Sequence, residues 1–356
     1  MSKIYPLLKG FGKLVVAVSV ASSVGYLLLL AINWQDEAPS AEVTQLQQRL
    51  VVGPIAENGY QLYLEQAAQL AQTASPALQS VFAGCALADC LTRLAAEPAE
   101  LEALWDSQST LLTLYNRLLL TPHWQESVPI NHEQLPPYQP LLQGQQLYLL
   151  QAYVAAMRGE TRQAQLMLDA DLQFWRRLLT QNRYLLSKMI SVAAIERHFQ
   201  LAQALAELQD TTNLSLSEVH AWHSPFTSDE LGLDLVLAGE WQFADQQYLM
   251  GYLEPNQLTL SQRIVLTILM PLYQQQASSN ERALLLNHCE HTNWQPSYPW
   301  YQWFYNPVGK ILNRVGSISC HEYLARLERL EQSRQRLLAN FQTASTGLVT
   351  QQTAKP

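Results

Sequence analysis

The sequence predicts an all-α protein that is held in a membrane by one helix near its N-terminus. Residues 14–32 carry no charge over 19 consecutive positions. The chain after them repeats apolar residues at intervals of three and four, and no stretch shows the alternation of a β-strand for more than a few residues. Hydrophobic residues make up 48% of the 356 residues, which suffices for a sizeable core.

The uncharged segment 14–32 is long enough to cross a bilayer, because 19 helical residues at 1.5 Å each span roughly 28 Å. Three lysines precede it and every acidic residue follows it. The positive-inside rule therefore predicts that residues 1–13 are a cytoplasmic flank and that the rest lies outside. The alternative is a cleaved signal peptide, whose apolar run is normally shorter. The nearest candidate cleavage site, residues 38–40, has a proline at its centre. A retained signal anchor is the expectation, and both alternatives export the same domain.

The exported part divides into a linker, a long helical domain and a tail. Residues 33–57 form the expected juxtamembrane linker, with a short helix near 41–51. The helical domain covers residues 58–341, and residues 342–356 are expected to be a flexible tail. Asn58 is a suitable cap for the first helix of the domain. Further helices are expected at 76–96, 99–120, 143–157, 161–180, 182–208, 228–253, 257–276, 280–291 and 320–341.

The clearest unit is a helical hairpin over residues 143–179. Its helices carry apolar stripes at spacings of three and four, and Gly159 suits the left-handed position of the turn between them. The apolar positions of the stripes are Leu147, Leu150, Val154, Met157, Ala164, Leu168, Leu172, Trp175 and Leu179.

This hairpin resembles a tetratricopeptide repeat. The positions that match the repeat are Tyr148, Ala152, Gly159, Ala164 and Leu168, and those that depart from it are Gln151, Ala155 and Asp171. No second copy follows at the 34-residue period, and such arrays need about three repeats. The resemblance therefore implies stacked helical hairpins, in a TPR-like or irregular α-solenoid domain, without establishing a peptide-binding array.

Several short segments, taken in order, resemble a group of uncharacterised membrane-anchored helical proteins of Gram-negative bacteria. They are Glu57–Tyr60, Cys85 to Leu91, Leu135–Tyr138, Asp169–Arg177 and Asn306–Lys310. The resemblance implies an envelope protein and brings no activity with it. We therefore expect a single-pass protein of the inner membrane with its C-terminal domain in the periplasm.

The charge balance argues against nucleic acid as a partner. The net charge is −8, and the exported part carries all 30 acidic residues with few lysines. The expected partners are the membrane, through residues 14–32, and another envelope protein or a cell-wall component.

No metal or cofactor site is expected from the sequence. The pairs His220/His223 and His288/His291 are three residues apart, but no histidine follows a glutamate at the spacing of a di-iron bundle. Nucleophile, phosphate-binding and dinucleotide-binding motifs are absent too. Glu240, an acid within an apolar helix, supports the alternative of an unrecognised enzyme with a cleft around Glu240 and the histidines.

Four cysteines in an exported domain suggest disulfide bonds. Cys289 and Cys320 are expected to close a loop of about 30 residues. Cys85 and Cys90 lie five apart, so a bond between them requires a break in the helix expected at 76–96. A structural role is expected rather than a redox one.

The most unusual segment is rich in aromatic residues. Prolines 296, 299 and 307 interrupt and bound it, so we expect an extended connector. Its rings either pack on the helical body, stack on sugar or peptide ligands, or enter the membrane interface. The candidate binding residues are Trp294, Tyr298, Trp300, Tyr301, Trp303 and Tyr305, with Phe304 beside them. These observations favour a binding or scaffolding role over catalysis.

Overall fold

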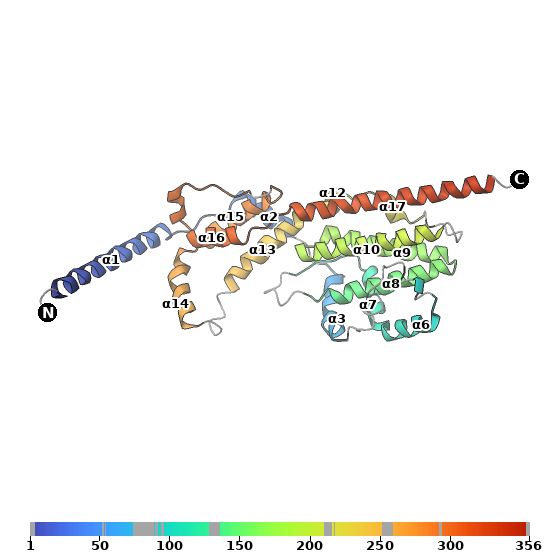
Figure 1. Cartoon of the computed structure of the whole chain (residues 1–356), viewed down its shortest axis with the longest axis horizontal. Helices are drawn as coiled ribbons and strands as arrows, with labels where there is room; N and C mark the ends of the chain where they lie inside the picture. Colours follow the sequence, from blue (N-terminus) through green and yellow to red (C-terminus); the bar gives the residue numbers. More distant parts are fainter. Residues whose placement is uncertain are drawn as a thin grey trace. The chain divides into compact units, whose positions relative to one another are not determined.

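The described part of the chain is helical, with no β-strand, and separates into two compact units. Figure 1 shows the course of the chain. The predicted all-α fold class is confirmed. The computed structural model describes residues 4–51, 53, 55–73, 89, 92–93, 96–127, 136–209, 216, 218–250, 259–291 and 294–353.

The first unit lies within residues 1–48 and 241–320. Its longest helix, α1 (Ile4–Ile32), contains a stretch from Lys13 to Ile32 that is long and apolar enough to cross a membrane, and none of that stretch is buried. The other elements are α2 (Ala41–Leu50), α14 (Leu260–Leu269), the 3₁₀ helix η3 (Met270–Leu272), α15 (Gln275–Asn287), the 3₁₀ helix η4 (Trp300–Phe304) and α16 (Pro307–Val315).

The second unit lies within residues 49–240 and 321–356. Helices α7 to α10 pack each against the next in chain order, and the long α17 returns to cover α10 (Figure 1). Its elements are α3 (Gly59–Thr73), α6 (Pro98–Ser107), α7 (Ser109–Leu119), α8 (Gln139–Met157), α9 (Thr161–Gln181), α10 (Leu185–Gln209), α11 (His220–His223), α12 (Ser228–Leu231) and α17 (His321–Thr353). Helix α13 (Asp234–Met250) begins in this unit and ends in the first.

The hairpin predicted at 143–179 is formed by α8 and α9. Gly159 has φ 78°, in the left-handed region. The Glu160 N–H donates to the Ala155 carbonyl at 2.9 Å, and the Gly159 N–H donates to Ala156, which closes a Schellman turn. All five stripe positions of α9 are buried, whereas Met157 at the end of α8 is exposed. Helix α8 is buried on nearly all sides, whereas the predicted stripe covers only one side of it.

Two of the expected boundaries differ from the structure. We expected one domain over 58–341, but residues 241–320 form a unit with the segment expected to be a linker, because polar side chains of that segment hydrogen-bond to them. Helix α17 continues to Thr353, so residues 342–353 are helical rather than a flexible tail. No proline interrupts the chain there.

Several expected helices are shorter than predicted. The helix at 99–120 is broken at Gln108, which ends α6 and precedes α7. The helix at 228–253 is interrupted at Gly232, where the backbone is extended. The helix at 257–276 ends at Leu269, because Pro271 follows and η3 begins. Most of the helix expected at 76–96 lies outside the described residues.

Candidate functional site

The aromatic segment, residues 294–305, is partly helical. The expectation of an extended connector is wrong for residues 300–304, which form η4. Pro296 and Pro299 both precede η4 and Pro307 follows it, so the residues between them keep their N–H groups. A short 3₁₀ helix forms in that interval.

Three rings of the segment face outward. Trp300 is 76% exposed, Tyr301 57% and Phe304 42%. The ring of Trp300 meets those of Tyr301 and Phe304 edge to face, at centroid distances of 6.2 and 5.8 Å. The exposed rings therefore form one continuous aromatic surface on η4.

The other rings of the segment pack on neighbouring side chains. Trp294 stacks on His288 with ring centroids 4.1 Å apart. Trp303 meets Tyr298 edge to face at 6.0 Å and lies under the Arg314 guanidinium at 5.1 Å. The candidate binding residues thus divide between an outer surface and an inner, packed set.

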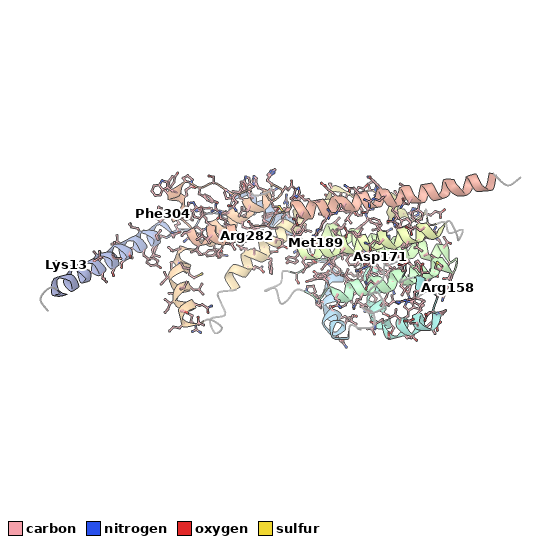
Figure 2. All side chains as sticks on the ribbon, in the orientation of Figure 1. Lys13, Arg158, Asp171, Met189, Arg282 and Phe304 are labelled. Carbon is pink, nitrogen blue, oxygen red and sulfur yellow. A yellow bond between two sulfur atoms is a disulfide. The ribbon has the colours of Figure 1, made fainter. Side chains whose placement is uncertain are left out.

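Asn33, the residue after the last turn of α1, connects this helix to the aromatic segment. Its side-chain amide donates to the Phe304 carbonyl at 2.8 Å, and its Oδ1 accepts from the Asn306 N–H at 2.7 Å. The Gln274 side chain donates to the Asn33 carbonyl at 2.6 Å. Phe304 lies beside the C-terminal end of α1 in Figure 2. Helix α1 and the aromatic segment are therefore joined through the buried polar side chains of Asn33 and Gln274.

Asn306 shapes the turn between η4 and α16. It has φ 48°, and its side chain caps α16 by accepting from the Gly309 N–H at 3.2 Å. Gly309 packs so closely that an added Cβ would lie 2.0 Å from Ser278 Oγ. The turn brings α16 against α15 and closes one side of a cleft.

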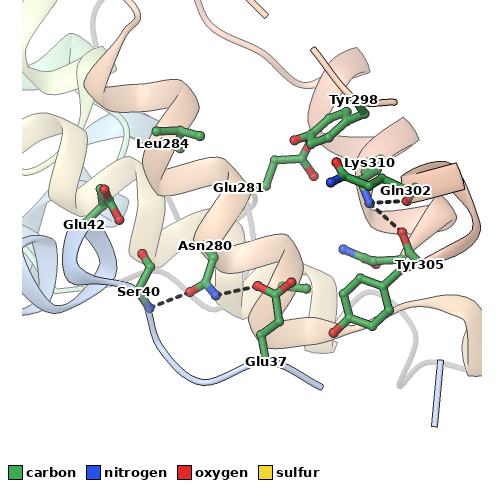
Figure 3. Close-up of a pocket in the computed structure, with 12 residues that line it drawn as sticks. Glu37, Ser40, Glu42, Asn280, Glu281, Leu284, Tyr298, Gln302, Tyr305 and Lys310 are labelled. Atoms are coloured by element: carbon green, nitrogen blue, oxygen red, sulfur yellow. Dashed lines mark hydrogen bonds between the residues drawn. The ribbon is translucent and has the colours of Figure 1, made fainter. Parts of the chain in front are cut away.

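That cleft lies in the first unit and has a volume of about 440 Å³ (Figure 3). Three carboxylates line it, from Glu37, Glu42 and Glu281, and the rings of Tyr298 and Tyr305 form part of its wall. The Glu37 carboxylate accepts one hydrogen bond from the Asn280 amide at 3.0 Å, and this amide also holds the Ala38 carbonyl. Carboxylates beside aromatic faces suit a cationic ligand.

Lys310 is the single basic residue among those lining the cleft, and its ammonium is held by the protein. It donates to the carbonyls of Gln302 at 2.9 Å and Tyr305 at 2.6 Å. It also lies 4.9 Å from the Tyr298 ring centroid. Burial lowers the pKa of Lys310, against the opposing effect of Glu281. The cleft wall already binds one ammonium through carbonyls and a ring.

The two tyrosines of the cleft stay protonated near neutral pH. Burial, followed by the nearby Glu37 carboxylate, raises the pKa of Tyr305 to about 12. Burial also raises the pKa of Tyr298, whose hydroxyl donates to Glu281 at 2.7 Å. Hydrogen bonding by its own backbone N–H lowers the pKa of Glu42. The cleft thus presents neutral phenols and carboxylate groups, with no arrangement that activates a nucleophile.

The disulfide expected between Cys289 and Cys320 is present, with Cα atoms 5.1 Å apart. The Cys320 N–H also donates to the Cys289 carbonyl at 2.9 Å. The bond closes the loop that contains η4 and α16, so it restricts the segment that carries the cleft wall. Cys85 and Cys90 lie outside the described residues.

Glu240 caps the N-terminus of α10. It belongs to the second unit, and its carboxylate accepts from the Leu185 N–H at 2.7 Å, at the start of α10. Burial raises its pKa, and this hydrogen bond opposes the rise. Of the histidines named with Glu240 in the alternative of an enzyme, His288 Nδ1 lies 2.9 Å from the Leu284 carbonyl oxygen, and His291 is exposed.

Asp171 and His198 form a buried pair that the sequence analysis did not identify. Both side chains are fully buried, and His198 Nδ1 lies 2.8 Å from Asp171 Oδ2. His198 Nε2 accepts from the Trp222 indole at 2.8 Å, so Nδ1 carries the proton that Asp171 accepts. Tyr115 and Gln145 also donate to Asp171 (labelled in Figure 2). A histidine with both nitrogens engaged and no exposure has no access to a substrate, so this pair stabilises the fold.

The sequence gives an indirect indication of Asp171 and Lys310, and none of the cleft carboxylates. Asp171 is one of the three residues that depart from the tetratricopeptide repeat, and a carboxylate inside an apolar stripe needs buried donors. Lys310 lies in one of the segments that resemble the Gram-negative group. The sequence does not indicate that Glu37 and Glu281 line the same cleft. They are brought together by contacts between segments more than 240 residues apart, such as the hydrogen bond from Asn280 to Glu37.

Comparisons with protein-family models, with characterised proteins and with solved structures give no match. Within the described ranges, no three His, Cys, Asp or Glu side chains are grouped in a way that would hold a metal ion. The features that bear on function are therefore the apolar helix α1, the cleft and the exposed aromatic surface on η4.

Proposed function

We propose that this protein is a single-pass protein of the bacterial inner membrane that binds a positively charged segment of another envelope protein in the cleft beside its anchor. The observation that carries the proposal is the cleft itself. It combines three carboxylates with two tyrosine rings and lies directly after the helix that is apolar enough to span the membrane.

Retention of the anchor, rather than its cleavage, is supported by polar contacts of the segment that a signal peptidase would remove. Cleavage at residues 38–40 would take away Asn33 and Asp36. The Asp36 carboxylate accepts from the N–H groups of Gln276 at 2.7 Å and Ala277 at 3.0 Å, which caps α15. Losing both residues would leave the cleft wall without part of its support.

A basic partner is favoured by the groups left for a ligand. The Asn280 amide donates to Oε2 of Glu37. Among the described residues no donor contacts Oε1, so this oxygen can accept a hydrogen bond from a ligand. The ammonium of Lys310 is turned to backbone carbonyls, so it does not neutralise this oxygen by direct contact. An arginine or lysine of a partner would gain a charge-assisted hydrogen bond here and a ring face from Tyr305.

The test uses the full chain in lipid nanodiscs and a fluorescent lysine-rich peptide as the probe, with an acidic peptide of equal length beside it. We expect the basic peptide to bind and the acidic one not to. Glu37→Gln removes one charge but keeps an oxygen that accepts from Asn280, so its affinity should fall about tenfold. Fluorescence anisotropy measures the dissociation constants.

The matched control is Glu290→Gln, because Glu290 is exposed in the same unit and does not line the cleft. It should bind the basic peptide as the unmodified protein does. Equal losses in Glu37→Gln and Glu290→Gln would show that the peptide senses only the general negative charge of the protein. That result would contradict the proposed cleft.

A further inference from the structure

Helix α14 is apolar and has no protein covering it within the described part of the chain. None of its residues is buried, and Leu260 is 75% exposed and Ile264 53%. Val265, Ile268 and Leu269 are exposed as well. An exposed apolar helix in water would be costly, because each of these side chains gains free energy by leaving water.

The same helix is hydrogen-bonded to the membrane-spanning part of α1. The Tyr26 hydroxyl donates to the Ile268 carbonyl at 2.9 Å. Tyr26 lies six residues before Ile32, which corresponds to about 9 Å along the helix from its end. With Ile32 at the boundary of the hydrocarbon, the C-terminal end of α14 lies inside the bilayer by about the depth at which interfacial amphipathic helices reside.

Some of the backbone groups at the two ends of α14 are paired within the protein. Thr259 and Gln262 form a reciprocal capping box at the N-terminus. At the other end Pro271 stops the helix, and the phenol of Tyr26 supplies the donor for the Ile268 carbonyl. Such pairing is unnecessary for a helix end in water, but it is required in hydrocarbon, where no solvent is available.

The exposed rings of η4 lie next to the end of the span. The Phe304 carbonyl accepts from Asn33, one residue beyond Ile32. This connection places Trp300 and Tyr301 near the level where the anchor leaves the hydrocarbon. Tryptophan and tyrosine are enriched at that level in membrane proteins. In Figure 1, α14 lies beside the C-terminal end of α1 and runs across it rather than along it.

We infer that α14 and the exposed rings of η4 form a second membrane contact, which lies in the outer leaflet around the end of α1. The occupant of this apolar surface is the lipid bilayer. The single charged residue of α14, Arg263, lies with Thr267 on one side of the helix, and the exposed Val265 and Leu269 lie on the opposite side, as expected if that side faces the acyl chains. The inference rests on α1 as a membrane span, and it places the cleft at the membrane surface.

The experiment reconstitutes the full chain in nanodiscs that contain a lipid with a photoreactive diazirine in its acyl chain. After illumination, mass spectrometry locates the labelled tryptic peptides. We expect label in α1 and in the peptide from Ile264 to Arg282, which carries the apolar face of α14. Val265→Asp, on the side of α14 opposite Arg263 and Thr267, should reduce the label in that peptide severalfold, and label in α1 should not change.

The matched control is Thr267→Asp, which adds the same charge to the side of α14 that carries Arg263 and should leave the labelling unchanged. Label in α1 with none in α14 would overturn the inference and leave the proposed anchor intact. Absence of label from both helices would contradict the anchor itself.

Discussion

Buried carboxylates in the second unit accept several hydrogen bonds, which offsets the free-energy cost of burying them. Glu126 is fully buried and accepts from the Arg183 N–H at 2.6 Å, from Ser187 at 2.9 Å and from Tyr138 at 3.2 Å. Burial raises the pKa of Glu126, and these hydrogen bonds lower it. A carboxylate in such a position orients the segments that supply its donors.

Among these buried carboxylates, replacement of Asp171 should lower the free energy of unfolding most. Asp171→Ala leaves the donors of Tyr115, Gln145 and His198 without their acceptor in a buried site. We expect the free energy of unfolding to fall by about 3–5 kcal/mol. Denaturant unfolding followed by circular dichroism measures the change. Glu160→Ala, at an exposed position, should change it by less than about 0.5 kcal/mol. An equally small effect at Asp171 would mean that the network contributes little.

At the scale of elements, the disulfide should matter most to the loop that carries η4 and α16. Cys289→Ser with Cys320→Ser removes a closure over 31 residues. The chain-entropy model gives a loss of about 3–4 kcal/mol for a loop of this length. We expect limited proteolysis to cut first between residues 290 and 320 in the variant. Cleavage at the same rate with and without the bond would show that hydrogen bonds from Asn33 suffice to hold the segment.

Helix α17 is attached to the second unit by apolar and ionic contacts. Leu327, Leu330 and Leu337 are buried. Arg334 donates to the Trp222 carbonyl at 2.8 Å and to the Glu331 carboxylate through Nε at 2.8 Å. The guanidinium is the main cause that lowers the pKa of Glu331 to about 2. The ion pair lies within α17, and the hydrogen bond from Arg334 to the Trp222 carbonyl connects α17 with the segment that contains α11.

This pKa gives a pH dependence with a defined sign. Because the folded-state pKa of Glu331 lies below its ordinary value of 4.5, its stabilisation is complete above about pH 4.5 and is lost as the pH falls towards 2. Glu331→Gln should lower the free energy of unfolding by on the order of 1 kcal/mol at pH 7. The difference between the two proteins should shrink at pH 3. Urea unfolding at both pH values tests this, and a difference that stays constant would exclude the ion pair as its source.

At the scale of the whole molecule, the sequence predicts features that depend on neighbouring residues, and it does not predict contacts between distant segments. Asn58 caps α3 as expected, with its Oδ1 accepting from the Tyr60 N–H at 3.1 Å, and Gly159 makes the predicted turn. Both depend on residues within one or two turns. The division into two units was not predictable, because Asn33 meets Asn306 across 273 residues and neither has an apolar periodicity that marks its partner. The cleft was missed for the same reason.

Orientation in the membrane is the property on which the proposed function depends. Three lysines precede the span and acidic residues follow it, so the C-terminus is expected outside the cytoplasm. A reporter enzyme that is active only outside the cytoplasm, fused after Pro356, should therefore be active. Replacement of Lys3, Lys9 and Lys13 by glutamate should reduce that activity, because it removes the charge difference across the span. The disulfide at Cys289 is consistent with the same compartment, since such bonds persist in oxidising surroundings. Activity of a cytoplasmic reporter alone would reverse the orientation, and the cleft would then face partners inside the cell.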